Sequence, residues 1–305
     1  MKIYVLAPRE NWICDRIAQE WKDNNSDYNT ENIQGADIIW LLAGWCWNHV
    51  PPDLLRSKKV VLTVHHIVPE KFDESKIAEF RIRDQFVDAY HVPNEKTAGI
   101  VNQLTGKPIY ICSYWYEPQL WSPIDKNEAQ KSLGLPVDKF IIGSFQRDTE
   151  GGSLKPKLEK GPDLFCEFVK KISREKDVHV LLGGWRRGFV INELENNSIP
   201  FSFFEQAPIE KLKTMYGACD LYVVASRYEG GPQAILEAAA MKVPIVSTDV
   251  GIASNVLSPY CIIDIPEQTY IPGSHLIEKN YQNVQRYSIV SHKSNYLKIF
   301  ESVLV

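Results

Sequence analysis

The chain has 305 residues, of which 44% are hydrophobic and 24% charged, and its formal net charge is −4 at pH 7. This length and balance predict a globular protein of about two domains. The slightly acidic charge excludes a protein that binds nucleic acid through an excess of positive charge. Residues 1–122 have no basic excess either, so charge does not support association with a membrane surface.

The six cysteines are scattered through the chain, without a C-x-x-C pair or a zinc-ligand spacing. We expect them to be small buried apolar residues in a reducing compartment. The sequence shows no signal-peptide pattern, and no apolar run approaches the roughly 20 residues that a membrane span needs. A cytoplasmic protein is therefore expected.

The N-terminal part alternates short apolar runs with amphipathic segments, which predicts a parallel sheet with crossover helices. Asn11 and Asn94 are suitable caps for the first and last of these helices. Strands are expected at residues 2–7, 38–43, 59–64, 89–93 and 108–112, and helices at 14–21, 72–90 and from 94 onward.

Two of these strands end in loops that carry candidate site residues. Trp45 and Trp47 follow the second strand and His65 follows the third, at the carboxyl ends where open α/β sheets bind ligands. The tryptophans either stack on a sugar ring or pack under their own loop, and the residues alone leave both readings open.

A segment rich in proline and aromatic residues, 114–123, interrupts the alternation and is the best linker in the chain. We place the domain boundary near Ser122, which divides the chain into residues 1–122, 123–285 and a closing segment 286–305. The spacing of Ile289, Leu297, Phe300 and Leu304 predicts an amphipathic helix over that segment.

The second part repeats the alternation, with strands expected at 140–145, 178–182, 199–204, 221–226 and 243–247. Its central feature is the stretch 221–251, which reads as strand, glycine-rich turn, helix and strand. Pro232 suits the first helical position, and the preceding glycines let a ligand approach the backbone. The N–H groups and the positive end of the helix dipole then form an anion site.

Two acids flank this anion site. Glu229 precedes the helix, and Glu237 lies eight residues on, roughly 12 Å further along the helix and within about a turn of the same face. A nucleotide sugar has a comparable layout of sugar, diphosphate and ribose. The alternative reading is a favourable charge near the dipole followed by a solvated helical face.

The stretch EGGPQAILEAAA, with its flanking strands and PIVSTDVG, resembles the E-x7-E signature of the retaining glycosyltransferases of family 4. Members have the α/β GT-B fold, in which two Rossmann-like domains with parallel sheets face each other across a cleft and the last helix returns to the first domain. The segment TVHHIVP resembles the family's T-V-H-D motif, with His66 in place of the aspartate.

The resemblance implies roles for particular residues. Glu229 contacts the transferred sugar, Glu237 holds the ribose hydroxyls, and His65 lines the cleft from the first domain. Arg147 and Lys160 grip the diphosphate, with Lys155 and Lys157 as weaker candidates in the same loop. The remaining donor-side positions are Gly230, Gly231, Pro232 and Gln233 at the turn, and Gly184, Trp185 and Gln206 near the base.

The first loop, residues 8–12, departs from the family pattern because it lacks the usual glycines. Arg9 is the substitute candidate for a phosphate contact there, and Arg9, Trp12, Trp45 and Trp47 are the weaker acceptor-side candidates. No D-x-D pair is present for a metal-held diphosphate. We therefore expect no cofactor and no metal, and Arg147, Lys160 and the helix N-terminus are expected to neutralise the leaving group.

These features together predict an enzyme that moves a sugar from a nucleotide-diphosphate sugar to a hydroxyl-bearing glycan or small-molecule acceptor, with retention of configuration. A non-catalytic nucleotide-sugar or glycan-binding protein on the same fold is the alternative, motivated by the glycine-free first loop. A nucleotide-sugar epimerase is a further reading. The motifs do not specify the base, the sugar, the acceptor or the oligomeric state.

Overall fold

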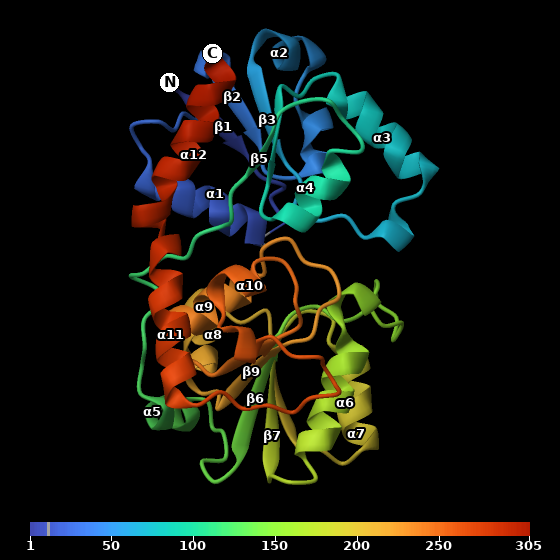
Figure 1. The fold of residues 1–305 in the computed structure, drawn as a ribbon, viewed down its shortest axis with the longest axis vertical. Helices are drawn as coiled ribbons and strands as arrows, with labels where there is room; N and C mark the ends of the chain where they lie inside the picture. Colours follow the sequence, from blue (N-terminus) through green and yellow to red (C-terminus); the bar gives the residue numbers. More distant parts are fainter. Residues whose placement is uncertain (11–12) are drawn as a thin grey trace. The chain divides into compact units, whose positions relative to one another are not determined.

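The computed structural model describes residues 1–10 and 13–305. The proposed cap Asn11 and the acceptor-side candidate Trp12 lie outside the described residues. The chain divides into two compact units, the first made of residues 1–115 with 289–305 and the second of residues 116–288. Each unit has its own five-stranded sheet, in which every strand pairing is parallel (Figure 1).

The division lies N-terminal to the boundary that we placed near Ser122, because the linker packs within the second unit. The Trp121 ring meets the Tyr216 ring at a centroid distance of 5.6 Å. Ser122 Oγ accepts a hydrogen bond from Lys213 Nζ at 3.3 Å. The proline- and aromatic-rich segment is therefore anchored rather than free, which its composition does not reveal.

The sheet of the first unit has the strand order β1-β2-β3-β4-β5. After β1 the chain returns beside the outer edge of that strand, where Thr30 N donates to Ile3 O at 3.0 Å, before it crosses to β2. The expected strands are confirmed with slightly shorter bounds. They are β1 (Ile3–Leu6), β2 (Ile38–Leu41), β3 (Lys59–Thr63), β4 (Ala89–Val92) and β5 (Ile109–Ile111).

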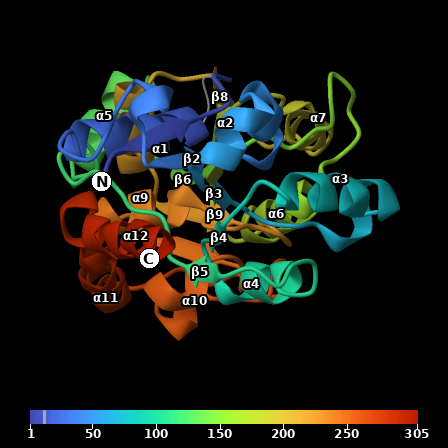
Figure 2. The same cartoon turned by 90° about the horizontal axis from the view of Figure 1, so that it is seen from above.

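Helices cover both faces of this sheet (Figure 2). On one face α2 (Pro52–Ser57), α3 (Glu74–Asp84) and α4 (Glu95–Val101) bury a core that includes Phe80 stacked on Tyr90. On the other face α1 (Ile13–Asn24) and α12 (Ile289–Leu304) close over Trp40. Alternate residues of β2 point to opposite faces, so Ile39 and Trp40 belong to different cores.

The helix expected over residues 72–90 is shorter than predicted. Asp73 caps α3 by accepting from Lys76 N at 3.1 Å, and α3 ends at Asp84. Asp88 already belongs to the sheet, because its carboxylate accepts from Val60 N at 2.8 Å. The predicted cap Asn94 is confirmed, since its side chain accepts from Thr97 N at 2.8 Å at the start of α4.

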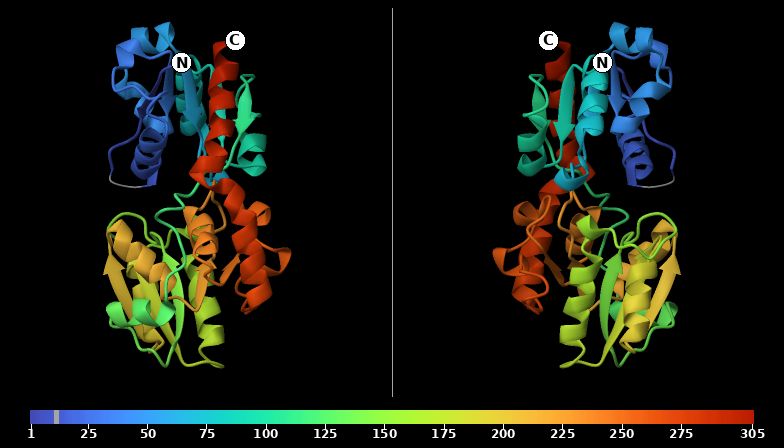
Figure 3. Two further views of the ribbon diagram at one scale, coloured as in Figure 1. Left: turned by 90° about the vertical axis from the view of Figure 1, so that its left-hand side faces the viewer. Right: turned by 90° about the vertical axis from the view of Figure 1, so that its right-hand side faces the viewer.

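The closing helix α12 packs in the first unit, as expected from the sequence. It runs alongside the strands and beside α1 (Figures 1 and 3), and its Phe300 ring meets the Trp21 ring at 5.6 Å. Ile289 and Phe300 are fully buried, whereas Leu304 is exposed. Since the neighbouring Val303 is buried, Leu304 lies on the solvent-facing side of the last turn.

The second unit is a doubly wound sheet with the strand order β10-β9-β6-β7-β8. All five expected strands are present, as β6 (Phe140–Phe145), β7 (Val178–Gly184), β8 (Phe201–Glu205), β9 (Leu221–Val224) and β10 (Ile245–Ser247). Its helices are α5 (Lys126–Ser132), α6 (Pro162–Ile172), α7 (Gly188–Asn196), α8 (Ile209–Gly217), α9 (Gln233–Ala240), α10 (Ala253–Val256) and α11 (Ser274–Val284).

These helices also lie on both faces of their sheet. Phe165 of α6 and Val190 of α7 share a buried core with Val180 of β7, while α8, α9, α10 and α11 lie on the other side (Figure 1). Short 3-10 helices complete the chain at Ile33–Gly35, Gly44–His49, Pro69–Lys71, Leu158–Lys160, Pro259–Cys261 and Gln285–Tyr287.

All six cysteines are buried and free, as expected from their spacing. Over residues 1–10 and 13–305, no helix combines the length and the apolarity that crossing a membrane requires.

Candidate functional site

The strand order of the second unit reverses between β6 and β9, which are hydrogen-bonded neighbours. The chain leaves β6 toward β7 on one side and leaves β9 toward β10 on the other. At such a switch point the loops diverge and leave a binding crevice beyond the carboxyl ends of the strands. The two loops that begin there, residues 146–161 and 225–232, carry Arg147, Lys160 and Glu229.

Lys160 and Glu229 form an ion pair at this point. Lys160 Nζ lies 2.5 Å from Glu229 Oε1, and the side chains are only 20% and 12% exposed. Ser226 Oγ donates to the same carboxylate oxygen at 3.0 Å. Two residues that lie 69 positions apart in the sequence thus meet through direct charge contact.

Gly161 allows the two loops to approach so closely. Its φ is +60°, and a Cβ there would lie 1.8 Å from Ala225 O, at the end of β9. The backbone N–H groups of Arg227 and Tyr228 donate to Glu159 O at 2.9 and 3.1 Å. Only glycine permits this close backbone contact, and the contact sets the position of Lys160.

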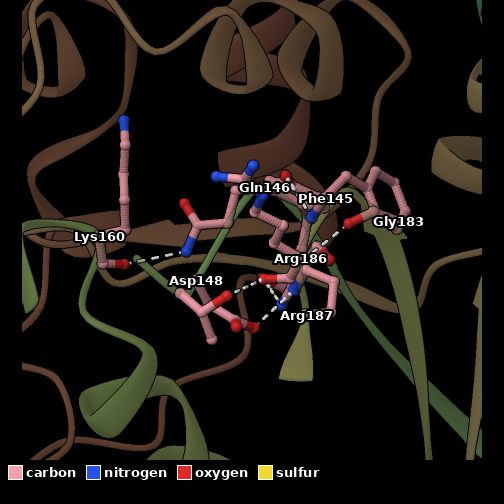
Figure 4. A network of polar contacts seen from close by, with 10 residues as sticks. Phe145, Gln146, Asp148, Lys160, Gly183, Arg186 and Arg187 are labelled. Atoms are coloured by element: carbon pink, nitrogen blue, oxygen red, sulfur yellow. Dashed lines mark hydrogen bonds and ion pairs between the residues drawn. The ribbon is translucent and has the colours of Figure 1, made fainter. Parts of the chain in front are cut away.

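The carboxyl end of β6 is tied to the same loop. Gln146 Nε2 donates to Lys160 O at 2.9 Å, and the Lys160 side chain extends away from this bond (Figure 4). The positive charge of Arg147 helps to lower the pKa of Lys157, after the larger effect of burial. Lys160 acts on Lys157 in the same direction, so two neighbouring cations disfavour the Lys157 charge.

Arg187 holds the ends of β6 and β7, from which these loops begin, and it was not identified from the sequence. Its guanidinium is fully buried and donates from Nε to Asp148 Oδ2 at 2.8 Å, and from one terminal nitrogen to Ser144 O and Gly183 O (Figure 4). Burial raises the pKa of Asp148, although the Arg187 charge opposes the rise. Arg187 thereby fixes the ends of β6 and β7. Nothing in the run Trp185-Arg186-Arg187 distinguishes it from its half-buried neighbour Arg186.

The helix that follows Glu229 is α9, and Pro232 is its N-cap rather than its first helical residue. Its ψ of 109° is extended, so helical geometry starts at Gln233. Gly251 packs against this turn, because a Cβ there would lie 2.6 Å from Gly230 O. The amide of Gln233 is buried, and neither its nitrogen nor its oxygen has a hydrogen-bond partner among the described residues. An unsatisfied buried amide at a helix N-terminus fits a place that a polar ligand completes.

Glu237 is 2% exposed, which rules out the reading that it belongs to a solvated helical face. It lies against Tyr216 of α8. Burial raises the pKa of Tyr216 well above its usual value, and the charge of the Glu237 carboxylate raises it further. The second acid is therefore part of a buried polar cluster under the turn.

The ends of β7 and β8 complete the second-unit site. A Cβ on Gly184, whose φ is +101°, would lie 2.6 Å from Gln146 O, and Gln206 N donates to Gly184 O at 3.0 Å. The Arg186 guanidinium lies over the Trp185 ring at 3.8 Å. Arg186 and Gln206 both have positive φ. Strained backbone gathers at functional sites, and these residues lie at the predicted base-side position.

His65 in the first unit is held by its own unit. Its Nε2 lies 2.6 Å from Leu42 O, and its Nδ1 contacts the Tyr114 hydroxyl. A carbonyl only accepts, so Nε2 carries the proton and Nδ1 accepts from Tyr114. Cys14 Sγ lies 3.4 Å from the same Nε2, and burial raises the pKa of that thiol to about 12.

The other first-unit candidates differ in environment. Trp45 is exposed and donates from Nε1 to Glu10 Oε1 at 3.2 Å. Trp47 instead stacks on Phe86 at 5.7 Å, which favours the packing reading for that residue. Arg9 has a φ of +59°, and its N–H donates to Asp15 at 2.8 Å. Within the described residues no three histidine, cysteine, aspartate or glutamate side chains are grouped so as to hold a metal ion.

Residues 151–263 match the family model described as "Glycosyl transferases group 1". The chain is 30% identical over 144 residues to the lipopolysaccharide core biosynthesis mannosyltransferase LpsB of Rhizobium meliloti (strain 1021), a match that covers 45% of this chain and 39% of the relative. It is 25% identical over 143 residues to the putative teichuronic acid biosynthesis glycosyltransferase TuaC of Bacillus subtilis (strain 168), covering 44% and 31%. These matches span less than half the length of either curated relative.

Solved structures match nearly the whole chain. The Anabaena protein Alr3699/HepE, in complex with UDP and glucose, has a TM-score of 0.78 at 15% identity, and the match covers 99% of this chain and all of that one. The sucrose-phosphate synthase of Thermosynechococcus elongatus has a TM-score of 0.69 at 16% identity, covering 98% and 80%. Two Rossmann-like units with parallel sheets and these neighbours show the GT-B fold.

Proposed function

We propose that this chain is a retaining glycosyltransferase of family 4, which transfers a sugar from a nucleotide-diphosphate sugar to a hydroxyl acceptor in glycan or glycoconjugate biosynthesis. The observation that carries the proposal is the Lys160–Glu229 pair at the N-terminus of α9. The pair lies at the switch point of a doubly wound sheet. It also lies within residues 151–263, which match the glycosyltransferase model.

The Lys160 ammonium and the Glu229 carboxylate are the two charges that bind the donor, and in the free protein they are paired with each other. The Glu229 carboxylate is the counter-ion of Lys160. It lies where a phosphate oxygen of the donor would contact the lysine. When the diphosphate arrives, Lys160 turns to it and releases the Glu229 carboxylate for the hydroxyls of the transferred sugar. Charge-assisted bonds of this kind are about twice as strong as neutral ones, so the exchange keeps both charges satisfied.

The leaving diphosphate is stabilised by fixed positive groups. Arg147, Lys160 and the N–H groups at the start of α9 are preorganised donors, and such electrostatic stabilisation is often the largest catalytic contribution. We propose that these groups act without a metal ion. In the retaining reaction the departing phosphate helps to deprotonate the acceptor hydroxyl, which then attacks from the same face.

The nucleoside end of the donor is assigned to the buried side of the turn. Glu237 lies within α9, beyond the turn that carries Glu229, and this order along the chain suits ribose hydroxyls beyond the diphosphate. Trp185 and the backbone near Gln206 follow the carboxyl ends of β7 and β8, and we assign the base to this edge of the sheet. His65 is proposed to contact the transferred sugar.

The ligands and names of the relatives indicate which donors to test first. HepE is described in complexes with UDP-glucose and with UDP, and LpsB is named a mannosyltransferase. We therefore propose a nucleotide-sugar donor whose sugar is a hexose, and UDP-glucose and GDP-mannose are the first two donors to try.

The test is thermal unfolding in the presence of UDP, GDP, ADP, CDP or dTDP, each with and without EDTA. A ligand at 100 times its dissociation constant adds about 2.7 kcal/mol to the free energy of unfolding. We expect one base to raise the melting temperature, and Glu237→Gln to reduce that rise. If none of the five shifts the wild type, the nucleotide-sugar site is refuted. A shift that vanishes with EDTA would refute metal independence.

A non-catalytic binding protein is the second candidate, and the first loop favours it. Residues 8–12 contain no glycine, and Arg9 adopts a positive φ that costs a non-glycine residue energy. Product analysis separates the readings. A transferase releases nucleoside diphosphate and loses this release in Glu229→Gln, a binding protein releases none, and an epimerase yields an isomerised nucleotide sugar.

A further inference from the structure

The loop between β6 and α6 carries two lysines beyond Lys160, and the structure places them in opposite environments. The Lys155 side chain is 72% exposed and pairs with Glu150 at 2.7 Å. The Lys157 side chain is 19% exposed. Two residues apart in one loop, they form a natural pair for comparison.

The backbone places Lys157 beside the proposed phosphate site. Lys157 N donates to Asp148 O at 2.7 Å, directly after Arg147, and Lys160 N donates to Lys157 O at 2.8 Å. A bridge between Thr149 and Pro156 closes the intervening loop. Lys157 is thus attached on one side to the Arg147 segment and on the other to Lys160.

The surroundings of Lys157 disfavour its charge. Its Nζ lies 3.5 Å from Glu159 Oε1, its carboxylate partner. Even so its pKa is lowered, first by burial and then by the charge of Arg147, with Lys160 acting in the same direction and Glu159 opposing. Burial and the two neighbouring cations thus outweigh the Glu159 carboxylate in their effect on the Lys157 charge.

Binding sites commonly hold charges that weaken the free protein, because function there is favoured over stability. We propose that Lys157 is a third phosphate-binding cation of the donor site, placed to contact the diphosphate together with Arg147 and Lys160, and that Lys155 has no part in it. This inference rests on the nucleotide-sugar site proposed above. Lys157 is a binding residue for the phosphates and makes no contact with the base or ribose.

The test compares Lys157→Met with Lys155→Met by calorimetric titration with UDP, UMP and uridine. Lys157→Met is expected to weaken UDP binding about tenfold, to weaken UMP binding less, and to leave uridine binding unchanged. Lys155→Met should match the wild type with all three ligands. Since a lost phosphate contact releases fewer ions, UDP binding to Lys157→Met should also depend less steeply on salt.

Thermal unfolding of the ligand-free variants separates binding from folding. Removing a disfavoured charge should leave the melting temperature of Lys157→Met unchanged or raise it, and Lys157→Arg should retain most of the UDP affinity. Equal UDP affinity in Lys157→Met and wild type, equal losses for UDP and uridine, or a variant that does not fold would each overturn the inference. Wild type that binds none of the five nucleoside diphosphates would instead refute the proposed function.

Discussion

Glu229 and Glu237 carry the same charge in different surroundings, and this difference assigns them different tasks. Glu229 is held by Lys160 and Ser226 in the open turn. Glu237 lies buried beside Tyr216. A carboxylate that a substrate can release from its partner suits the reacting sugar, whereas a buried one suits a fixed contact with ribose.

Exchange of each acid for glutamine tests this assignment. Glu229→Gln should lower turnover about 100-fold or more, as losing one preorganised contact to a transition state commonly does. It should leave UDP affinity unchanged or tighten it, because Lys160 loses its internal competitor. Glu237→Gln should raise the dissociation constant for nucleoside diphosphate. Turnover and calorimetric affinity measured on both variants decide the matter, and two variants that match wild type in both would contradict it.

At the scale of elements, the site depends on how closely the loop after β6 approaches the end of β9. Gly161 permits that approach, and the buried guanidinium of Arg187 holds the ends of β6 and β7 in place below it. Gly161 and Arg187 both act through contacts with the backbone, so they fix the loops with or without a bound ligand.

Gly161→Ala should destabilise the protein and weaken UDP binding. Its Cβ would lie 1.8 Å from Ala225 O, so the loop must move and Lys160 must leave Glu229. Gly151 is a matched control in the same loop, with the same φ of +60° and nothing within 4 Å of its Cβ. Backbone strain alone costs about 1 kcal/mol, so urea unfolding should show that loss in Gly151→Ala and a clearly larger one in Gly161→Ala. Equal losses would show that the close contact is unimportant.

At the scale of the whole molecule, each unit buries its own set of polar and ionisable side chains. In the first unit, His91 is 1% exposed, with Nδ1 3.0 Å from Thr63 Oγ1 and Nε2 2.7 Å from Cys112 O. Burial lowers its pKa to about 4, with smaller contributions from His65 and His292. Burial also lowers the pKa of His292 on α12.

These histidines predict acid sensitivity of the first unit. The unfolded chain takes up the His91 proton near pH 6.5 but the folded chain only near pH 4, so stability should fall as the pH drops through that window and level off below it. The contribution of His91 is about 3 kcal/mol. Urea unfolding between pH 7.5 and 4 should show a shallower pH dependence in His91→Gln than in wild type, while the exposed His275→Gln keeps the wild-type slope. Parallel slopes in all three proteins would contradict the prediction.

Much of this organisation was predicted from the sequence because it depends on local patterns. Runs of five or six largely apolar residues between turns identified the ten strands of the described residues, and polar caps such as Asn94 identified helix starts. The turn before α9 and its two acids were visible because glycines and a proline directly before a run of helix-forming residues mark a helix start. Helix ends were less accurate, as at 72–90, because Asp73 caps the start and Asp88 at the other end is already hydrogen-bonded to β3.

The tertiary structure alone decided which distant residues meet. Lys160 pairs with Glu229, Arg187 is buried while Arg186 is not, and Lys157 is enclosed while Lys155 is exposed. None of these distinctions follows from residue type or spacing, because burial and charge contact depend on where the crossovers of the sheet bring separate loops together. The sequence determined the elements and the chemistry available at their ends. The strand order of the sheets selected the residues that share one site.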